Sequence, residues 1–349
     1  MSIAISMLLG GVSAASISAG LTAPPTETTS TLPFTNPGAE VDVSGWTNRR
    51  GVLRRQTAYY RTGVAAFAVG GQNEAWSTQE FTVPAGQQSP IDAGNRLVEV
   101  KHWQMGYDSD TDDGGTTLEF YDGSDALLVR RFYPREDFPE PDFVERTTSC
   151  PIPPGTRKIR WGMYGVRFAG IEISQYFDDI GPMEIKPISG KSASLLYWNN
   201  GNSRTGWVNV TGTLISDTYD TWITSQPIFA WGNEATAEAY IPLDVSSDAT
   251  AIDTGSAEVN LGVFQSSYNG NDQGEIYLEF RDGSGDLIGT QVTISAMATT
   301  DPQGTGRIGI ETVPSGTRSI RLGFKGTRVD GSNLDAYFQW ISVFLLTPL

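Results

Sequence analysis

The chain has 349 residues, of which 39% are hydrophobic and 11% aromatic, enough for two packed cores. A formal net charge of −16, from 40 acidic and 24 basic residues, repels phosphate backbones and argues against nucleic-acid binding. The single cysteine, Cys150, excludes an intrachain disulfide and a thiolate metal cluster. Glycine, Asn, Asp, Ser and Thr separate short β-branched and aromatic runs, a pattern typical of an all-β sandwich.

Residues 1–22 form an apolar leader. Its apolar core and small residues have the pattern of a secretory signal peptide, but no Lys or Arg precedes Arg49, so the basic start of such a signal is missing. Gly11, Ser13 and Ser16 interrupt a run that is too short to span a bilayer. We therefore expect a segment that anchors the protein to another subunit, with a cleaved signal as the alternative. A Pro/Thr-rich linker follows, and residues 1–32 are assigned to leader and linker.

The rest of the chain contains an internal repeat. Trp46 recurs as Trp207, and the Tyr-Phe pair at 176–177 recurs at 337–338, each 161 positions later. The segment LEFYDGS at 118–124 recurs as LEFRDGS at 278–284, at an offset of 160. A unit of this size is a domain rather than a solenoid repeat. The repeat predicts two β-sandwich domains, residues 33–188 and 189–349, related by duplication.

The strand predicted at 97–107 has two different faces. Alternation places Val98, Val100 and His102 on one face, and because their counterparts at 259, 261 and 263 are apolar, this is the core face. His102 is therefore expected to be a hydrogen-bonded core imidazole, not a catalyst. The opposite face mixes aromatic and polar side chains in both copies and indicates a ligand-binding surface formed by Glu99, Lys101, Trp103 and Tyr107 in the first copy and Asn260, Phe264 and Tyr268 in the second.

Two further segments contribute to these predictions. In the strand at 159–167, alternation turns Arg160 and Tyr164 outward, and Arg321 is the outward counterpart in the second copy, so all three are added to the candidate ligand-binding residues. The acidic segment 108–115, DSDTDDGG, has the D-x-D-x-D pattern of a calcium loop. Asp113 stands where the turn of an EF-hand requires glycine, so a hydrated turn is favoured over a calcium loop.

The ends of the first copy resemble those of galactose-binding-like jelly-roll domains, a group that includes many carbohydrate-binding modules. Residues 36–47, NPGAEVDVSGWT, resemble the opening motif of that group, and residues 176–180, YFDDI, resemble its last strand. Ala39 departs from the usual aromatic, and Gln-Trp at 339–340 replaces the acidic pair in the second copy. The resemblance implies an all-β fold of two tandem jelly-roll β-sandwiches with a short N-terminal anchoring segment.

The same resemblance implies a metal site. In that family the first Glu and the Asp of the last strand often share a structural calcium ion, so Glu40 and Asp178 or Asp179 are implied as its ligands in the first domain. The alternative is that Glu40 caps a turn and the Asp pair is a solvated strand end. We expect the site to be lost in the second copy.

Catalysis is not expected, because no nucleophile motif, phosphate loop or carboxylate pair in contrasting surroundings is visible. Aromatic side chains among charges favour glycan binding, and packing on the sister domain or a neighbouring chain is the alternative use of the same face.

The architecture favours a non-enzymatic virion structural protein, because duplicated carbohydrate-binding-like jelly rolls behind an apolar leader resemble bacteriophage tail, fibre or capsid decoration components. Residues 1–22 would contact other virion subunits, and the domains would cover the particle or adhere to a host glycan. A homo-oligomer located on the virion is expected, without a membrane span. The alternative is a secreted, extracellular polysaccharide-binding protein with two carbohydrate-binding modules.

Overall fold

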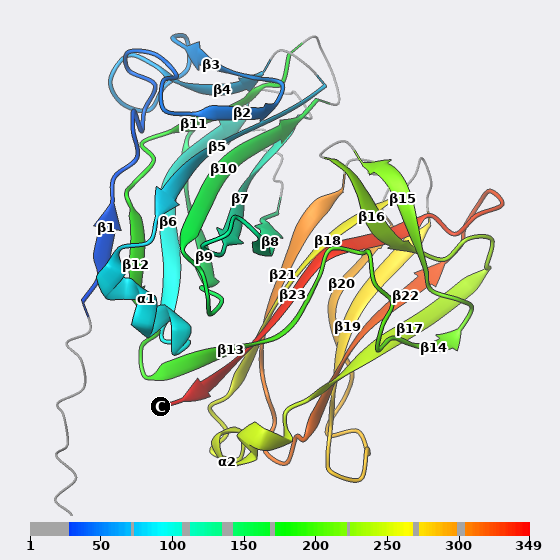
Figure 1. The fold of residues 1–349 in the computed structure, drawn as a ribbon. Helices are drawn as coiled ribbons and strands as arrows, with labels where there is room; N and C mark the ends of the chain where they lie inside the picture. The colour runs from blue at the N-terminus through cyan, green and yellow to red at the C-terminus, as the bar shows by residue number, and fades with distance from the viewer. Residues whose placement is uncertain are drawn as a thin grey trace, which may run out of the picture.

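The structure, a computed structural model, describes residues 28–70, 73–106, 112–134, 142–167, 172–221, 224–267, 272–298 and 304–349. Within these ranges the chain forms 23 β-strands, two short α-helices and one short 3-10 helix. The predicted all-β fold is confirmed, and the chain is two tandem jelly-roll β-sandwiches (Figure 1). The predicted leader, residues 1–22, lies outside the described ranges. No helix in the described ranges is long and apolar enough to cross a bilayer.

The first domain is a sandwich of two antiparallel sheets, called sheets A and B here. Sheet A has the strand order β1-β12-β6-β11-β4-β3, with β9 paired to β6, and sheet B has the order β2-β5-β10-β7-β8. Sheet A consists of β1 (Ser30–Leu32), β3 (Val52–Gln56), β4 (Ala66–Gly70), β6 (Arg96–Gly106), β9 (Val144–Pro151), β11 (Gln175–Asp178) and β12 (Met183–Pro187). Sheet B consists of β2 (Thr47–Arg50), β5 (Glu74–Thr82), β7 (Asp113–Tyr121), β8 (Leu127–Phe132) and β10 (Lys158–Val166). Helix α1 (Ala85–Asp92) lies between β5 and β6 in the chain.

The second domain repeats this plan with sheets C and D. Sheet C has the order β15-β16-β23-β18-β21, with β13 paired to β23, and sheet D has the order β14-β17-β22-β19-β20. Sheet C consists of β13 (Lys191–Asn199), β15 (Ile215–Thr221), β16 (Thr224–Ala230), β18 (Glu258–Ser267), β21 (Thr305–Thr312) and β23 (Ala336–Pro348). Sheet D consists of β14 (Val208–Thr211), β17 (Thr236–Asp244), β19 (Gln273–Arg281), β20 (Val292–Ala298) and β22 (Ser319–Thr327). The short helices η1 (Ser246–Asp248) and α2 (Ala249–Ile252) take the place of α1.

The strand positions confirm the internal repeat. Strands β1, β2, β10 and β11 begin 161 positions before β13, β14, β22 and β23, and β7 begins 160 positions before β19. The long strand β23 covers the positions of both β11 and β12, so one continuous strand replaces two. The duplication therefore extends to the strand order of both sheets.

The core of the first domain lies between sheets A and B and follows the predicted alternation. Val98, Val100 and His102 are all buried, and the His102 ring lies 5.4 Å from the Trp161 ring. Burial, reinforced by the nearby Arg146 charge, lowers the pKa of His102 to about 3, so this imidazole is neutral at physiological pH. Trp46 packs against the same core through Phe67 and Trp161.

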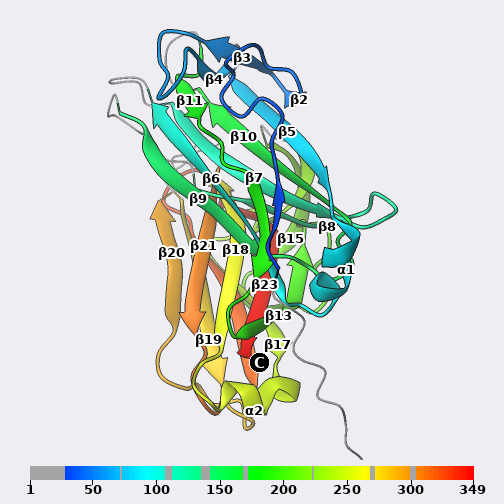
Figure 2. The same ribbon diagram turned by 90° about the vertical axis from the view of Figure 1, so that its left-hand side faces the viewer.

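The domains pack through sheet B of the first and sheet C of the second, as Figures 1 and 2 show. The buried aromatic cluster between them, called the domain junction here, consists of Trp76, Phe132, Tyr164, Phe264 and Trp340. The Phe132 ring lies 5.0 Å from the Phe264 ring and stacks on Trp340 at 4.6 Å.

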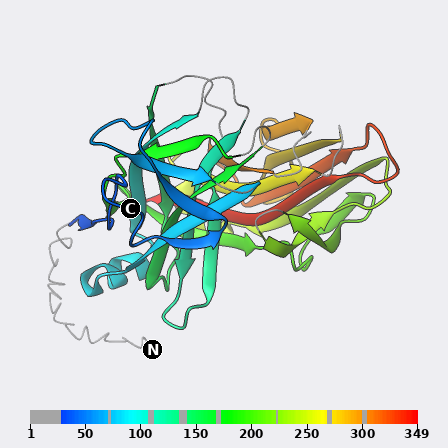
Figure 3. The ribbon, with the colours of Figure 1, turned by 90° about the horizontal axis from the view of Figure 1, so that it is seen from above.

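Buried hydrogen bonds reinforce the junction beside this cluster. The Arg131 guanidinium on β8 donates hydrogen bonds to Asn260 and Ser342 of the second domain. The end of β23 also crosses the boundary, because Phe344 and Leu346 belong to the hydrophobic core of the first domain. The two sandwiches, seen from above in Figure 3, are therefore held together by side-chain contacts as well as by the covalent backbone between them.

Candidate functional site

The outer face of sheet A carries aromatic side chains that do not belong to the core. Trp103 and Met105 alternate with Gln104 along β6, and the register places Tyr176 of β11 beside Met105 and Asp178 beside Trp103. Met105 and Tyr176 are buried in a small cluster with Ala68, whereas Trp103 is half-buried. The Tyr176 ring is stacked on Tyr59 at a centroid distance of 5.2 Å. Because alternate residues of paired strands share a face, these side chains form one surface, which we call the sheet A face.

Two hollows lie on this face, one on each side of Trp103. The larger, of about 510 Å³, is lined by Ala58, Tyr59, Tyr60, Arg61, Met105, Asp142 and Phe143. The smaller, of about 360 Å³, is lined by Glu99, Lys101, Gly181, Pro182, Glu184 and Lys186. The larger, called the aromatic hollow here, combines three aromatic rings with Arg61 and Asp142, and the smaller is lined mainly by charged side chains. Lys101, Trp103 and Met105 follow one another along the same side of β6. Lys186 forms an ion pair with Glu99 at 2.7 Å across the floor of the charged hollow.

The segment 58–64, between β3 and β4, forms one wall of the aromatic hollow. Its Arg61 guanidinium lies over the Trp103 ring, with 3.6 Å between the guanidinium carbon and the ring centroid. The same guanidinium pairs with the Asp179 carboxylate, and the Thr62 hydroxyl donates to Asp179 at 2.5 Å. This loop therefore joins the aromatic face to the acidic pair that follows β11.

The predicted metal ligands lie behind this segment. The buried Asp178 carboxylate accepts the backbone N–H groups of Arg61 at 2.8 Å and Thr62 at 3.2 Å, and Glu40 accepts that of Val64 at 2.7 Å. A Cβ added at Gly38 would lie 3.1 Å from Asp178 Oδ1 and 3.4 Å from Glu40 Oε1, so the two carboxylates converge on one point. Burial raises the pKa of Asp178, against the effect of its backbone hydrogen bonds.

Two of the three predicted ligands thus come together. Glu40 and Asp178 offer the hard carboxylate oxygens that Ca²⁺ prefers, whereas Asp179 is turned toward Arg61 and Thr62. Within the described ranges no group of three or more His, Cys, Asp or Glu residues could hold a metal ion. A calcium ion, with its six to eight oxygen ligands, would therefore need backbone carbonyls or water beside these two carboxylates.

The acidic loop has a different role in the part that the structure describes. Asp112 is buried and accepts the backbone N–H of Ser174 at 3.0 Å. Its counterpart Asp272 accepts the backbone N–H groups of Val329 and Asp335 at 2.7 and 2.8 Å. In both copies, therefore, this aspartate ties one loop to another.

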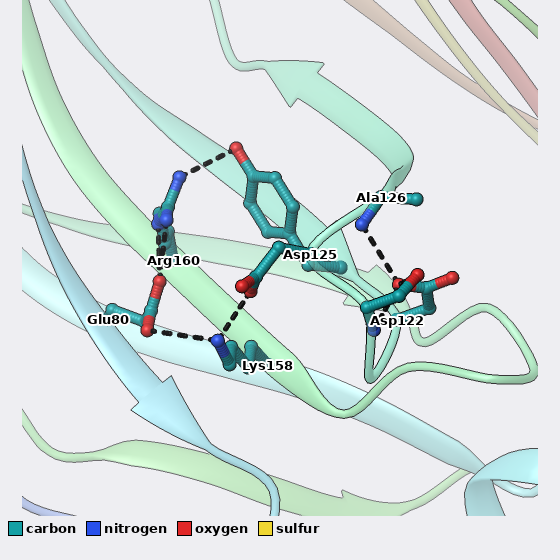
Figure 4. A network of polar contacts seen from close by, with 8 residues as sticks. Glu80, Asp122, Asp125, Ala126, Lys158 and Arg160 are labelled. Atoms are coloured by element: carbon teal, nitrogen blue, oxygen red, sulfur yellow. Dashed lines mark hydrogen bonds and ion pairs between the residues drawn. The ribbon is translucent and has the colours of Figure 1, made fainter.

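Of the predicted ligand-binding residues, Glu99, Lys101 and Trp103 lie on the sheet A face. Tyr107 and Tyr268 lie outside the described residues. Arg160 is on the outer face of sheet B, where it pairs with Glu80 at 2.7 Å (Figure 4). Arg321 is on the outer face of sheet D, 4.2 Å from the Tyr240 ring. The four sheets have separate outer faces, so these two arginines cannot share a ligand with Trp103.

Tyr164, Asn260 and Phe264 require a correction, because all three are buried between the domains. The Tyr164 hydroxyl donates to the Tyr133 carbonyl at 2.6 Å, Asn260 accepts from Arg131, and Phe264 packs on Phe132. Side chains covered in this way have no surface left for a ligand. For these residues the structure corresponds to the alternative of packing on the sister domain.

The loop side of the sheet A face is not predictable from strand periodicity. Tyr59, Tyr60 and Arg61 lie outside any strand, so alternation could not assign them to a face. Tyr176 belongs to the repeat and to the last-strand motif, neither of which indicates a ligand-binding role. The one available signal was the Tyr-Tyr-Arg triplet itself, which has Asp-Thr-Trp at the corresponding positions of the second copy, 220–222.

No protein-family model matches the chain, and no curated protein matches it. Among solved structures, the N-terminal tandem of two CBM22 domains from Paenibacillus barcinonensis is 13% identical, with a TM-score of 0.35, over 94% of this chain and 100% of that one. A C-terminal family 22 carbohydrate-binding module from Clostridium thermocellum is 13% identical, with a TM-score of 0.32, over 44% of this chain and 92% of that one. The enzymatically active domain of bacteriophage CBA120 tailspike protein 4 is 12% identical, with a TM-score of 0.31, over 41% of this chain and 21% of that one. At these TM-scores, function has to be judged from the geometry of the site.

Proposed function

We propose that the first domain binds a glycan on the sheet A face and that the protein is not an enzyme. The observation that carries the proposal is the position of Trp103 between an aromatic and a charged hollow, on a face turned away from the sister domain. Sugars present flat C–H faces that stack on aromatic rings, and hydroxyls that bond to carboxylate, ammonium and guanidinium groups. The face offers both kinds of group within one surface.

The length of the face favours an oligosaccharide over a single sugar. The accessible side chains Glu99, Lys101 and Trp103 follow one another along β6, and at about 3.4 Å per residue they span roughly 14 Å. A surface of that length can contact several linked sugar rings. We therefore propose a polysaccharide or a long surface glycan as the ligand class.

A structural calcium ion is part of the same proposal. Glu40 and Asp178 would hold it, together with backbone carbonyls, and the ion would neutralise two carboxylates that converge beside Gly38. Its contribution would be structural, because both carboxylates already accept backbone N–H groups of the segment that borders the aromatic hollow.

We also propose a place on the virion, as a tail, fibre or decoration component. The proposal is supported by the duplicated sandwiches and by the apolar leader in the sequence. A secreted polysaccharide-binding protein remains the competing assignment. Detection of the chain in purified particles would support the virion assignment, and its recovery only from culture medium, free of particles, would contradict it.

The glycan proposal is tested by screening the full chain against a polysaccharide array, with calcium and with a chelator. Trp103→Ala should lose at least about fivefold in affinity, since stacking on one aromatic ring contributes on the order of 1 kcal/mol or more. Tyr240→Ala is the matched control, because Tyr240 also lies under an arginine but on the outer face of sheet D. Equal binding by the Trp103→Ala protein and the wild type would contradict the proposal.

A further inference from the structure

The ring face that Trp103 would offer to a sugar is already occupied. The Arg61 guanidinium carbon lies 3.6 Å from the ring centroid, which is van der Waals contact for a flat group stacked on an indole. A sugar therefore cannot stack on this face of the Trp103 ring while Arg61 stays in place.

Two carboxylates hold Arg61 over the ring, in different ways. Asp178 accepts its backbone N–H at 2.8 Å, which fixes the main chain, and Asp179 pairs with its guanidinium, which fixes the side chain. The Arg61 side chain is 36% exposed, so its ion pair is accessible to water and salt.

The comparable pair in the second domain is built differently. Arg321 lies 4.2 Å from the Tyr240 ring, but both residues sit in the paired strands β22 and β17. Arg61 comes instead from the loop between β3 and β4, so its side chain can turn away without breaking any strand pairing. The Arg61 side chain can therefore leave the Trp103 ring while the sheet stays intact.

We propose that Arg61 is a built-in cover for Trp103, which occupies the stacking platform in the free protein and is displaced when a glycan binds. This inference rests on the proposed function of the sheet A face. The cover lowers glycan affinity by the free energy needed to break the stacking contact and the ion pair with Asp179. Salt weakens the ion pair, so moderate salt should raise the glycan affinity of the wild type.

The cover is tested first without any ligand, by acrylamide quenching of Trp103 fluorescence. The Trp103 signal is obtained in each background as the difference from the same protein carrying Trp103→Phe. Arg61→Ala should increase quenching of this signal at least twofold, whereas the matched control Arg321→Ala should leave it unchanged. Unchanged quenching in the Arg61→Ala protein would overturn the inference whatever the glycan result.

The second test measures affinity for a glycan identified by the array, at low and moderate salt. Arg61→Ala should bind roughly fivefold more tightly than the wild type and lose the salt-induced gain, and Asp179→Asn should show a smaller gain. Weaker binding by Arg61→Ala would mean that Arg61 contacts the ligand and would overturn the cover. If no glycan binds any variant while Trp103 becomes more accessible in Arg61→Ala, the glycan proposal and the displacement step both fail, and only the covering of Trp103 in the free protein is supported.

Discussion

The outer faces of sheets A and C are two copies of one surface, but the first is open to solvent and the second is covered by the sister domain. In the first domain Glu99 and Lys101 line an open hollow and Trp103 is half-buried. The corresponding residues of the second domain, Asn260, Gly262 and Phe264, are covered by β8. The two faces differ in the size and charge of these side chains. Replacement of Glu and Lys by Asn and Gly removes two charges and a long side chain from the surface that must be desolvated.

Glycine makes the close approach in the second copy feasible. A Cβ at Gly262 would lie 2.9 Å from Arg131 Nε, and a Cβ at Gly306 on β21 would overlap the carbonyl oxygen of Phe132. Edge strand β8 could not lie on sheet C if these positions carried side chains. A duplicated outer face thus becomes a domain interface when its charges are lost and its backbone becomes accessible to the sister domain.

The largest effect is expected from a substitution that creates a cavity in the domain junction. Phe132 is 2% exposed and contacts aromatic rings of both domains, so Phe132→Ala should lower the free energy of unfolding by about 4 kcal/mol. Calorimetry should then resolve two unfolding transitions in place of one. Phe143→Ala, on the half-buried rim of the sheet A face, is the control and should keep a single transition. An unchanged transition in the Phe132→Ala protein would show that the junction does not couple the domains.

A second test uses a core position where the copies differ in charge chemistry, with His102 in the first copy and Val263 in the second. The folded pKa of about 3 lies below the usual value of 6.5, so the unfolded state binds more protons between these values. His102 therefore costs stability as pH falls from about 6.5 toward 3, by up to about 1.4 kcal/mol per pH unit. His102→Val should flatten the pH dependence of urea unfolding over that window. Parallel curves for both proteins would show that the imidazole keeps its proton affinity in the fold.

The smallest effect is expected outside both compared faces. Arg160 is paired with Glu80 at the surface of sheet B, and Arg160→Ala should cost less than about 1 kcal/mol of stability. Glycan binding measured by titration should be unchanged, because Arg160 does not lie on the sheet A face. A clear loss of affinity would place the binding surface on sheet B.

Alternation was sufficient to predict which residues enter the cores. Val98, Val100 and His102 are all buried as expected, because a strand with one buried face must alternate. Alternation could not show which outward residues share a face, since that depends on strand pairing between distant segments. Trp103 and Arg160 both point outward, but from opposite sheets.

Two further features depended on contacts that no local pattern encodes. The burial of Phe264 and Asn260 results from the approach of β8, a strand some 130 residues earlier in the chain. Asp178, more than 100 residues later, holds the backbone of Arg61 and Thr62 beside the sheet A face. The opening and closing motifs of the first copy pointed to Glu40 and Asp178, whose carboxylates both lie near Gly38, and their use as calcium ligands stays a prediction.

The end of β23 has a consequence for the synthesis of the chain. Phe344 and Leu346 complete the core of the first domain, although that domain's own last strand ends at Pro187. A ribosome adding about 5 to 20 residues per second needs roughly 10 to 30 s to cover the distance between them. During that interval the apolar surface of the first domain that Phe344 and Leu346 cover is still exposed. A product truncated before these residues would keep that surface exposed permanently.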